Sequence, residues 1–389
     1  MSLGGLVKEK ARALGCAEVG IAAAEPLSAA ERIVHERIDH GLMAGLPWFT
    51  KERVSLACQT QRLLPGARSF IVLAMSYHPG EEPGEPSRVE PIGRVSSYAA
   101  GQDYHEVVGG KLRELAGFAA KEGRGGSRSA GACPPPSRSF VDTSPLVERA
   151  VAERAGVGWF GKNSNLLTRG QGSWVFLGVL ATTLELAADA PLRKSCGTCQ
   201  ACLPACPTGA IVAPYVIDNA RCISYLTIEN KGTIPRELRP LLGNHIFGCD
   251  DCQTVCPVNQ RKKAHSSPEF APQPGLGPHL PLIPLLSLSE QELQVRFRPT
   301  ALRRAKRRGL LRNVCVALGN SGDRAAVPAL GRALAEDPEA LVRAHAAWAL
   351  GRLGGGPARA ALERARSPET DAYVREETEG ALAEADAEG

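Results

Sequence analysis

Eight of the twelve cysteines lie between residues 196 and 256, and their spacing could bind metal. The first four follow the pattern C-x2-C-x2-C-x3-C-P, which ends at Pro207. A second run, C-x2-C-x3-C-P, ends at Pro257, and one more cysteine stands upstream of it. Thiolates at this spacing ligate iron–sulfur clusters, in which three cysteines of one run and one from elsewhere hold a cubane. The spacing therefore predicts one-electron transfer.

The eight thiolates suffice for two [4Fe-4S] clusters. The second run lacks a cysteine three residues before Cys249, where Ile246 stands, and Cys222 can replace it. By analogy with bacterial two-cluster ferredoxins, the last cysteine of each run crosses to the other cluster. We therefore assign to the first cluster Cys196, Cys199, Cys202 and Cys256. We assign to the second cluster Cys206, Cys222, Cys249 and Cys252.

Two other uses of these cysteines fit less well. Disulfides require an oxidising compartment, and the N-terminal sequence lacks the apolar run of an export signal. Zinc ribbons use paired C-x2-C knuckles and do not require a four-cysteine run closed by proline. We expect a cytoplasmic protein without membrane contact, because no stretch approaches the ~20 apolar residues of a spanning helix.

The charge of the chain is uneven. The net charge is only +5, but residues 296–308 contain seven basic side chains and no acidic one. Such a block can be a solvated helix face, or it can bind phosphate groups.

The last ninety or so residues form a repeat. The pair Ala317-Leu318 recurs at Ala349-Leu350 and at Ala381-Leu382. Amphipathic helices are predicted at 310–319, 325–335, 340–350 and 357–366, with glycine-rich turns between them. This pattern is typical of a short HEAT-like array, although an ordinary helical bundle has similar physics.

The first 190 or so residues must hold the remaining chemistry. Apolar runs at 69–77 and 173–182 predict buried strands, and helical patterns at 6–14, 29–41, 106–121 and 145–156 surround them. This mixture favours an α/β or α+β domain. Segments 79–91 and 123–136 are rich in Pro, Gly or Glu and predict surface loops.

Two polar segments of this region could carry function. Asp142 stands at a strand-to-helix transition, where an aspartate is about as often a helix N-cap as a functional acid. Lys162 and Asn163 follow a glycine-rich stretch whose backbone could approach a cofactor. Asp103-x-His105 approximates a motif in which histidine ligates the cobalt of cobalamin, but the glycine is one residue late, and we infer no such ligation.

The order of these motifs resembles the epoxyqueuosine reductase family. The resemblance rests on V-D-T-S-P-L-V-E-R-A, G-V-G-W-F-G-K-N, the two cysteine runs, R-C-I-S-Y-L-T-I-E and the closing repeat. It implies base-off cobalamin, two [4Fe-4S] clusters, and reduction of epoxyqueuosine to queuosine at the wobble position of tRNA. It also implies an external low-potential electron donor, such as a flavodoxin or a ferredoxin, and a monomer.

The resemblance also assigns roles to residues. Asp142 becomes the general acid that protonates the opening epoxide. The residues expected to contact cobalamin are Tyr104, His105, Asp142, Lys162, Asn163, Arg221 and Ser224. The residues expected to contact the tRNA anticodon stem-loop are Arg149, Lys231, Arg303, Arg304, Lys306, Arg307, Arg308, Arg312 and Arg343.

The expected architecture is an α+β multi-domain protein. We expect an α/β cobalamin-binding catalytic domain at 1–185, a ferredoxin-like domain at 186–265, a linker at 266–300 and an α-helical HEAT-like repeat at 301–389. Two other functions stay open at this point. One is a small-molecule reductase similar to reductive dehalogenases, and the other is a non-catalytic ferredoxin-type electron carrier.

Overall fold

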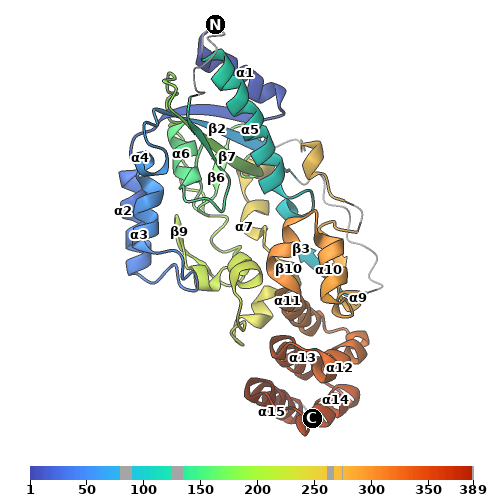
Figure 1. The fold of residues 1–389 in the computed structure, drawn as a ribbon. Helices are drawn as coiled ribbons and strands as arrows, with labels where there is room; N and C mark the ends of the chain where they lie inside the picture. The colour runs from blue at the N-terminus through green and yellow to red at the C-terminus, as the bar shows by residue number, and fades with distance from the viewer. Residues whose placement is uncertain (79–89, 124–134, 261–266, 274, 388–389) are drawn as a thin grey trace. The chain divides into compact units, whose positions relative to one another are not determined.

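The computed structural model describes the chain except residues 79–89, 124–134, 261–266, 274 and 388–389 (Figure 1). Most of the two predicted loops at 79–91 and 123–136 therefore lies outside the described residues. The chain forms two compact units that interleave in sequence. The first unit comprises Met1–Glu81, Gln102–Ala220 and Asp251–Ala271, and the second comprises Glu82–Gly101, Arg221–Asp250 and Pro272–Gly389.

The first unit is built on a four-stranded antiparallel sheet in the order β1-β2-β7-β4. The strands are β1 (Glu18–Ala23), β2 (Ser69–Ser76), β4 (Ser137–Phe140) and β7 (Val175–Thr182). All eight residues of β2 are buried, as its continuous apolar run predicts for a central strand. The two strands predicted from the sequence are confirmed as β2 and β7.

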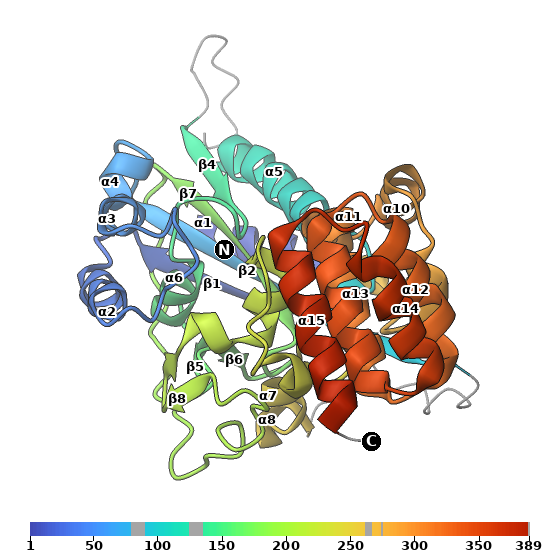
Figure 2. The same cartoon turned by 90° about the horizontal axis from the view of Figure 1, so that it is seen from below.

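Helices cover both faces of this sheet (Figure 2). Successive residues of β7 point to opposite faces. Gly178 faces α5 (Tyr104–Glu122), because a Cβ on it would lie 2.5 Å from Val108 of that helix. Val179 instead joins the buried cluster that contains Val151 of α6 (Glu148–Arg154). The sheet thus holds the start of α5 and the segment before α6 at fixed positions.

The other elements of the first unit are short. Its further helices are α1 (Leu3–Ala13), α2 (Ser28–Asp39), α3 (Lys51–Cys58), α4 (Thr60–Leu63), α7 (Asp251–Thr254) and α8 (Pro257–Gln260). Two hairpins complete it: β5 (Gly158–Phe160) with β6 (Leu166–Thr168), and β8 (Ile211–Ala213) with β9 (Val216–Ile217). The predicted helices at 6–14, 29–41 and 106–121 are confirmed by α1, α2 and α5. The one predicted at 145–156 is shorter than expected and begins at Glu148.

The second unit combines a small sheet with a helical array. The sheet is β10-β3-β11, formed by His245–Phe247, Ile92–Val95 and His279–Pro281. This unit also contains a π-helical turn, η3 (Tyr225–Glu229), and 3-10 turns at Arg239–Leu242 and Ala301–Ala305. Its two short helices are α9 (Leu282–Leu286) and α10 (Glu290–Phe297).

The array contains α11 (Lys306–Ser321), α12 (Val327–Glu336), α13 (Ala340–Leu353), α14 (Gly356–Arg366) and α15 (Ala372–Ala387). Figure 1 shows α11, α13 and α15 stacked in one layer, with α12 and α14 in a second. The sequence repeat has a packing cause. A Cβ on Gly319 would lie 2.9 Å from the Cα of Ala349, and one on Gly351 would lie 3.0 Å from the Cα of Ala381. Equivalent glycines therefore let successive helices approach closely, which confirms the predicted HEAT-like stacking.

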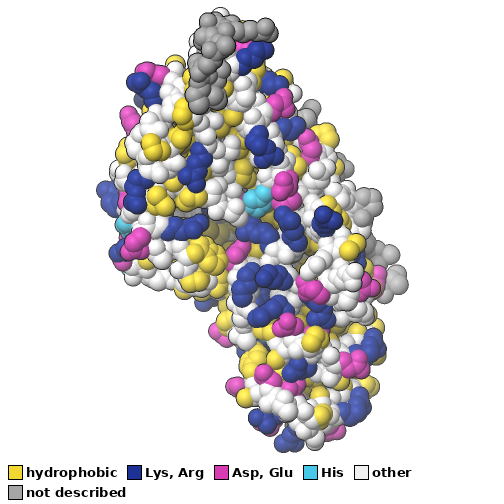
Figure 3. Space-filling view, in the orientation of Figure 1, with side chains coloured by type: hydrophobic (Ala, Val, Ile, Leu, Met, Phe, Trp, Pro, Cys, Tyr) yellow, Lys and Arg dark blue, Asp and Glu magenta, His cyan; other side chains and the backbone are white. Residues whose placement is uncertain are grey.

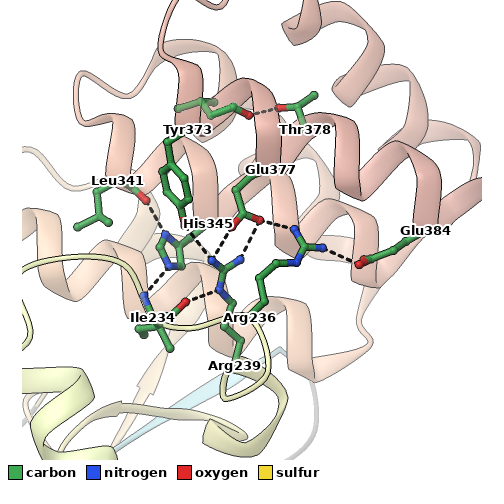
Figure 4. A network of polar contacts seen from close by, with 10 residues as sticks. Ile234, Arg236, Arg239, Leu341, His345, Tyr373, Glu377, Thr378 and Glu384 are labelled. Carbon is green, nitrogen blue, oxygen red and sulfur yellow. Dashed lines mark hydrogen bonds and ion pairs between the residues drawn. The ribbon is translucent and has the colours of Figure 1, made fainter. Parts of the chain in front are cut away.

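A buried ionic network fastens the array to the segment that precedes it within the second unit (Figure 4). Arg239 and Glu377 are 1% and 3% exposed and form a two-point ion pair. Glu377 also accepts from Arg236, at 2.6 Å. His345 accepts the N–H of Ile234 through Nε2 while its Nδ1 lies 2.7 Å from the carbonyl of Leu341. These contacts require a neutral imidazole, and burial lowers the pKa of His345 well below its usual value.

No helix among the described residues is long and apolar enough to span a membrane.

Candidate functional site

Asp142 stands just beyond the end of β4, in a strained loop. Its φ of +46° is unusual for a residue other than glycine and marks stored strain. Helix α6 begins only at Glu148, and its N-cap residue, Val147, makes no side-chain capping bond. The N-cap interpretation of Asp142 is therefore wrong. The loop is held instead by Ser144, whose Oγ accepts the N–H of Val141 at 2.9 Å.

Two residues at the start of α5 point to the Asp142 carboxyl. The hydroxyl of Tyr104 donates to Oδ2 of Asp142 at 2.5 Å, and Nε2 of His105 lies 3.5 Å from the same oxygen. On its other side, His105 contacts Asp103 through Nδ1 at 2.8 Å. Asp103 is the N-cap of α5 and is buried, so it orients the imidazole.

The two carboxylates decide the charge of this imidazole. Burial lowers the pKa of His105, but the contacts with Asp103 and Asp142 outweigh burial and raise the pKa to about 9. His105 is therefore cationic at neutral pH, and it holds a proton on Nε2 next to the Asp142 carboxyl. Its Nε2 is buried and makes no hydrogen bond to any described residue.

An aromatic wall lies behind these polar groups. The rings of Tyr104 and Phe176 stack at 4.4 Å with an interplanar angle of 7°. Phe176 also contacts Tyr77 at 4.5 Å and Phe270 at 4.6 Å. The sequence reasoning missed Phe176 and Tyr77. Phe176 lies in β7 and Tyr77 directly follows β2, and nothing in the local sequence distinguishes them from core residues.

The first cysteine run lies in the same unit. The thiol of Cys202 has a raised pKa, because it is partly buried and because Cys196, Cys256 and Cys199 add negative charge beside it, which together outweigh a backbone hydrogen bond that lowers the pKa. Cys256 comes from the second run, so the structure brings these four side chains near one another. The sulfur of Cys206 accepts the N–H of Ala210 at 3.3 Å.

Lys162 and Asn163 fasten the β5–β6 hairpin to the cysteine loops. Nζ of Lys162 donates to the carbonyl of Gly197 at 2.8 Å, and Nδ2 of Asn163 donates to the carbonyl of Cys252 at 3.1 Å. Both side chains are buried. In the same hairpin, the indole N–H of Trp159 is buried without a partner among the described residues. The structure thus places Lys162 and Asn163 at the cysteine loops.

The remaining predicted cofactor residues lie in the second unit. Arg221, Cys222, Ser224 and Cys249 belong to it. Their predicted roles stay predictions.

Basic side chains gather near the start of α11 in the second unit (Figure 3). Arg303, Lys306, Arg308 and Lys231 are exposed. Partial desolvation lowers the pKa of Lys231; Glu229 raises the pKa, and Arg312, Arg304 and Lys306 lower it. Such mutual repulsion indicates a locally positive surface suited to a polyanion.

Three arginines of the predicted RNA contacts have other partners. Arg312 is fully buried and donates to the carbonyls of Leu226, Asn230 and Gly232, so we no longer assign it to an RNA surface. Arg307 is paired with Asp337, and Arg343 with Glu369.

Two further arginines make contacts that leave part of the side chain accessible. Arg149 is exposed and donates to the carbonyl of Ser164 at 2.6 Å. Arg304 pairs with Glu229 at 2.9 Å and is partly exposed.

Comparison with known proteins fits this arrangement. Residues 58–143 match the family model "Epoxyqueuosine reductase QueG, DUF1730", residues 195–259 match a 4Fe-4S double cluster binding domain, and residues 300–383 match HEAT repeats. The chain is 39% identical to epoxyqueuosine reductase of Escherichia coli (strain K12) over 348 residues, and this alignment covers 88% of each chain. The chain belongs to the epoxyqueuosine reductase family. The Pseudomonas aeruginosa member is 40% identical over 347 residues, 88% of this chain and 92% of that one.

Solved structures of epoxyqueuosine reductases extend the similarity over the whole fold. A selenomethionine-labelled epoxyqueuosine reductase has a TM-score of 0.91 and 33% identity, covering 98% of this chain and 99% of that one. An epoxyqueuosine reductase with an epoxyqueuosine-modified tRNA-Tyr stem loop has a TM-score of 0.90 and 32% identity, covering 99% of each. Like the members of this family, the chain is an oxidoreductase with a double-cluster domain and a HEAT repeat.

Proposed function

We propose that this protein reduces epoxyqueuosine to queuosine at the wobble position of tRNA and that Asp142 is its general acid. The family to which the chain belongs supports the reaction. The observation that carries the site is the contact of Asp142 with Tyr104 and His105, in a loop whose left-handed backbone is strained. Strained residues concentrate at functional sites.

The residues around Asp142 orient it and supply charge. Tyr104 donates to one carboxyl oxygen, and the Tyr104 ring is fixed by its stack on Phe176. The cationic His105 carries a proton next to the same oxygen, and Asp103 holds its ring in place. Loss of oxygen from an epoxide as water consumes two protons, so a proton donor that can be refilled suits this chemistry.

The described residues fit the groups that such a reaction needs. The gathered thiols of Cys196, Cys199, Cys202 and Cys256 fit one [4Fe-4S] cluster. The buried Nε2 of His105, which faces Asp142 but makes no hydrogen bond to a described residue, and the aromatic wall fit base-off cobalamin, which Tyr104, His105 and Asp142 would contact. When bound, cobalamin would supply the reduced metal that delivers electrons to the substrate.

Basic side chains of the second unit would bind the RNA, and the clusters would receive the electrons. Arg303, Lys306 and Arg308 are exposed near Lys231 and suit contacts with phosphates of an anticodon stem-loop. An external one-electron donor, such as a flavodoxin or a ferredoxin, would reduce the clusters. We further propose that the protein acts as a monomer.

The function is tested by an anaerobic assay of the reconstituted protein with cobalamin, a reductant and tRNA carrying epoxyqueuosine. The digested nucleosides are examined by mass spectrometry for the loss of one oxygen. Asp142→Asn should lower the rate by at least about 100-fold, as for the loss of a general acid. Asp39→Asn, a change of the same chemistry at an exposed aspartate paired with Lys51, is the control and should keep the wild-type rate.

Absorption spectra of each variant must show intact clusters and bound cobalamin. Failure of the wild-type protein to convert the tRNA would contradict the proposed reaction. Normal conversion by Asp142→Asn would contradict the role of Asp142 alone.

A further inference from the structure

A second carboxyl lies near Asp142, at the first residue of α6. The side chain of Glu148 is partly buried, and its Oε1 atom is buried without a hydrogen-bond partner among the described residues. Glutamates in the first turn of a helix usually face solvent and favour the helix dipole. A buried and unpaired carboxyl oxygen at this position therefore requires another explanation.

The surroundings of Glu148 favour its protonated form. The pKa of Glu148 is raised to about 8, chiefly by burial and also by the charge of Asp142. The N–H of Glu148 itself, Arg149 and the N–H of Asp142 each lower the pKa, but they do not outweigh burial. Helix α6 packs against β1, β2, β5, β6 and β7, and Asp142 and Arg149 are the side-chain charges of described residues that act on this carboxyl. Because this pKa lies above neutral, the Glu148 carboxyl carries a proton beside Asp142 at pH 7.

The proposed reaction needs more protons than one acid can hold. Conversion of an epoxide to an alkene breaks both C–O bonds and takes up two electrons and two protons, and the oxygen leaves as water. The two electrons come singly from the external donor through the clusters. Asp142 holds one proton at a time, so it must be refilled within each turnover.

We propose that Glu148 is a positioning residue for Asp142. Glu148 steadies the Asp142 loop through the N–H of Asp142, and it returns a proton to the Asp142 carboxyl. This inference rests on the proposed function. His105 is the competing source, but its ring lies between two carboxylates, with Nδ1 toward Asp103 and Nε2 toward Asp142, and both stabilise the cation. The proton of Glu148 has no such partner and is released more readily.

The test compares Glu148→Gln with Glu153→Gln, a neutralised glutamate on the same helix whose raised pKa comes from burial. Single-turnover rates are measured from about pH 6 to about pH 10. In the wild-type protein the rate should fall as the pH rises through about 8. Glu148→Gln should be roughly tenfold slower at pH 7 and should lack this fall, because refilling through a second group contributes less than direct proton transfer. Glu153→Gln should keep the wild-type profile.

A second measurement does not depend on turnover. Infrared difference spectra of the wild-type protein should show a protonated carboxyl that ionises near pH 8 and is absent from Glu148→Gln. Without that carboxyl signal, or with an unchanged pH profile in Glu148→Gln, the inference is overturned, even if the variant is slower. If His105→Gln removes the fall near pH 8 and Glu148→Gln does not, refilling belongs to His105. If the wild-type protein fails to convert the tRNA while the infrared signal is present, the proposed function fails and the coupled carboxyls stand.

Discussion

The ion pair between Arg239 and Glu377 offers a quantitative test of what holds the helical array to the segment before it. Glu377 accepts from both nitrogens of the Arg239 fork at 2.6 and 3.0 Å, and from Arg236 at 2.6 Å. Tyr373 adds a further hydrogen bond at 3.0 Å. Glu377→Gln keeps the shape of the side chain but removes the charge that compensates the buried Arg239.

The expected cost follows from burial. Removing one partner of a buried ion pair leaves an uncompensated charge and costs about 3–5 kcal/mol. Because Gln can still accept one hydrogen bond, we expect the lower value, about 3 kcal/mol. Each 1.36 kcal/mol is a factor of about ten, so local opening should become roughly 150-fold more frequent.

Hydrogen exchange measures this opening locally. The N–H of Ile234 is bound by His345 beside the ion pair and should exchange about 150-fold faster in Glu377→Gln. The control is Glu363→Gln, which breaks the exposed pair with Arg359 and should change exchange less than about threefold. The double variant Arg239→Met with Glu377→Leu should recover most of the protection, because both charges are gone. Unchanged exchange at Ile234 in Glu377→Gln would refute the reasoning.

Three further predictions concern packing, pH and RNA. Gly178→Val should destabilise the fold by about 1–3 kcal/mol through overpacking, because a Cβ at this position would lie 2.5 Å from Val108; a lower midpoint of thermal denaturation checks this. His105 should titrate near pH 9 by imidazole NMR. Because its pKa in the folded protein is raised above 6.5, the contribution of the His105 cation to folding stability is complete below pH 6.5 and is lost as the pH rises through about 9. Asp103→Asn should narrow this pH range, because it removes one of the two carboxylates that raise the pKa. Lys306→Ala should weaken tRNA binding and reduce by about one the slope of log affinity against log salt, measured by a binding titration at several salt concentrations.

Regular periodicity made the framework predictable. The strands β2 and β7 and the helices of the array follow from continuous apolar runs and from the recurring Ala-Leu pair. The reason for the recurrence, close helix contact at Gly319 and Gly351, becomes visible only in three dimensions.

The candidate site was less predictable, because its residues are defined by partners distant in sequence. The local pattern could not decide whether Asp142 caps a helix. The answer depends on where α6 begins, and it begins at Glu148, later than the sequence predicts. The basic block could not reveal that Arg312 is buried, because its acceptors are carbonyls some eighty residues upstream. Glu148 resembled an ordinary first-turn glutamate, and only the burial of Oε1 separates it from one.

The geometry at Asp142 also indicates why its loop can respond to small changes. A left-handed backbone at a residue other than glycine costs about 1–3 kcal/mol. The hydrogen bond from Tyr104 to the Asp142 carboxyl contributes about 1.5–3 kcal/mol when that carboxyl is charged. These opposing free energies are nearly equal, so protonation of Asp142, which weakens the charge-assisted hydrogen bond from Tyr104, removes a contribution as large as the strain. The proton that Asp142 carries therefore controls both its reactivity and the position of the loop that bears it.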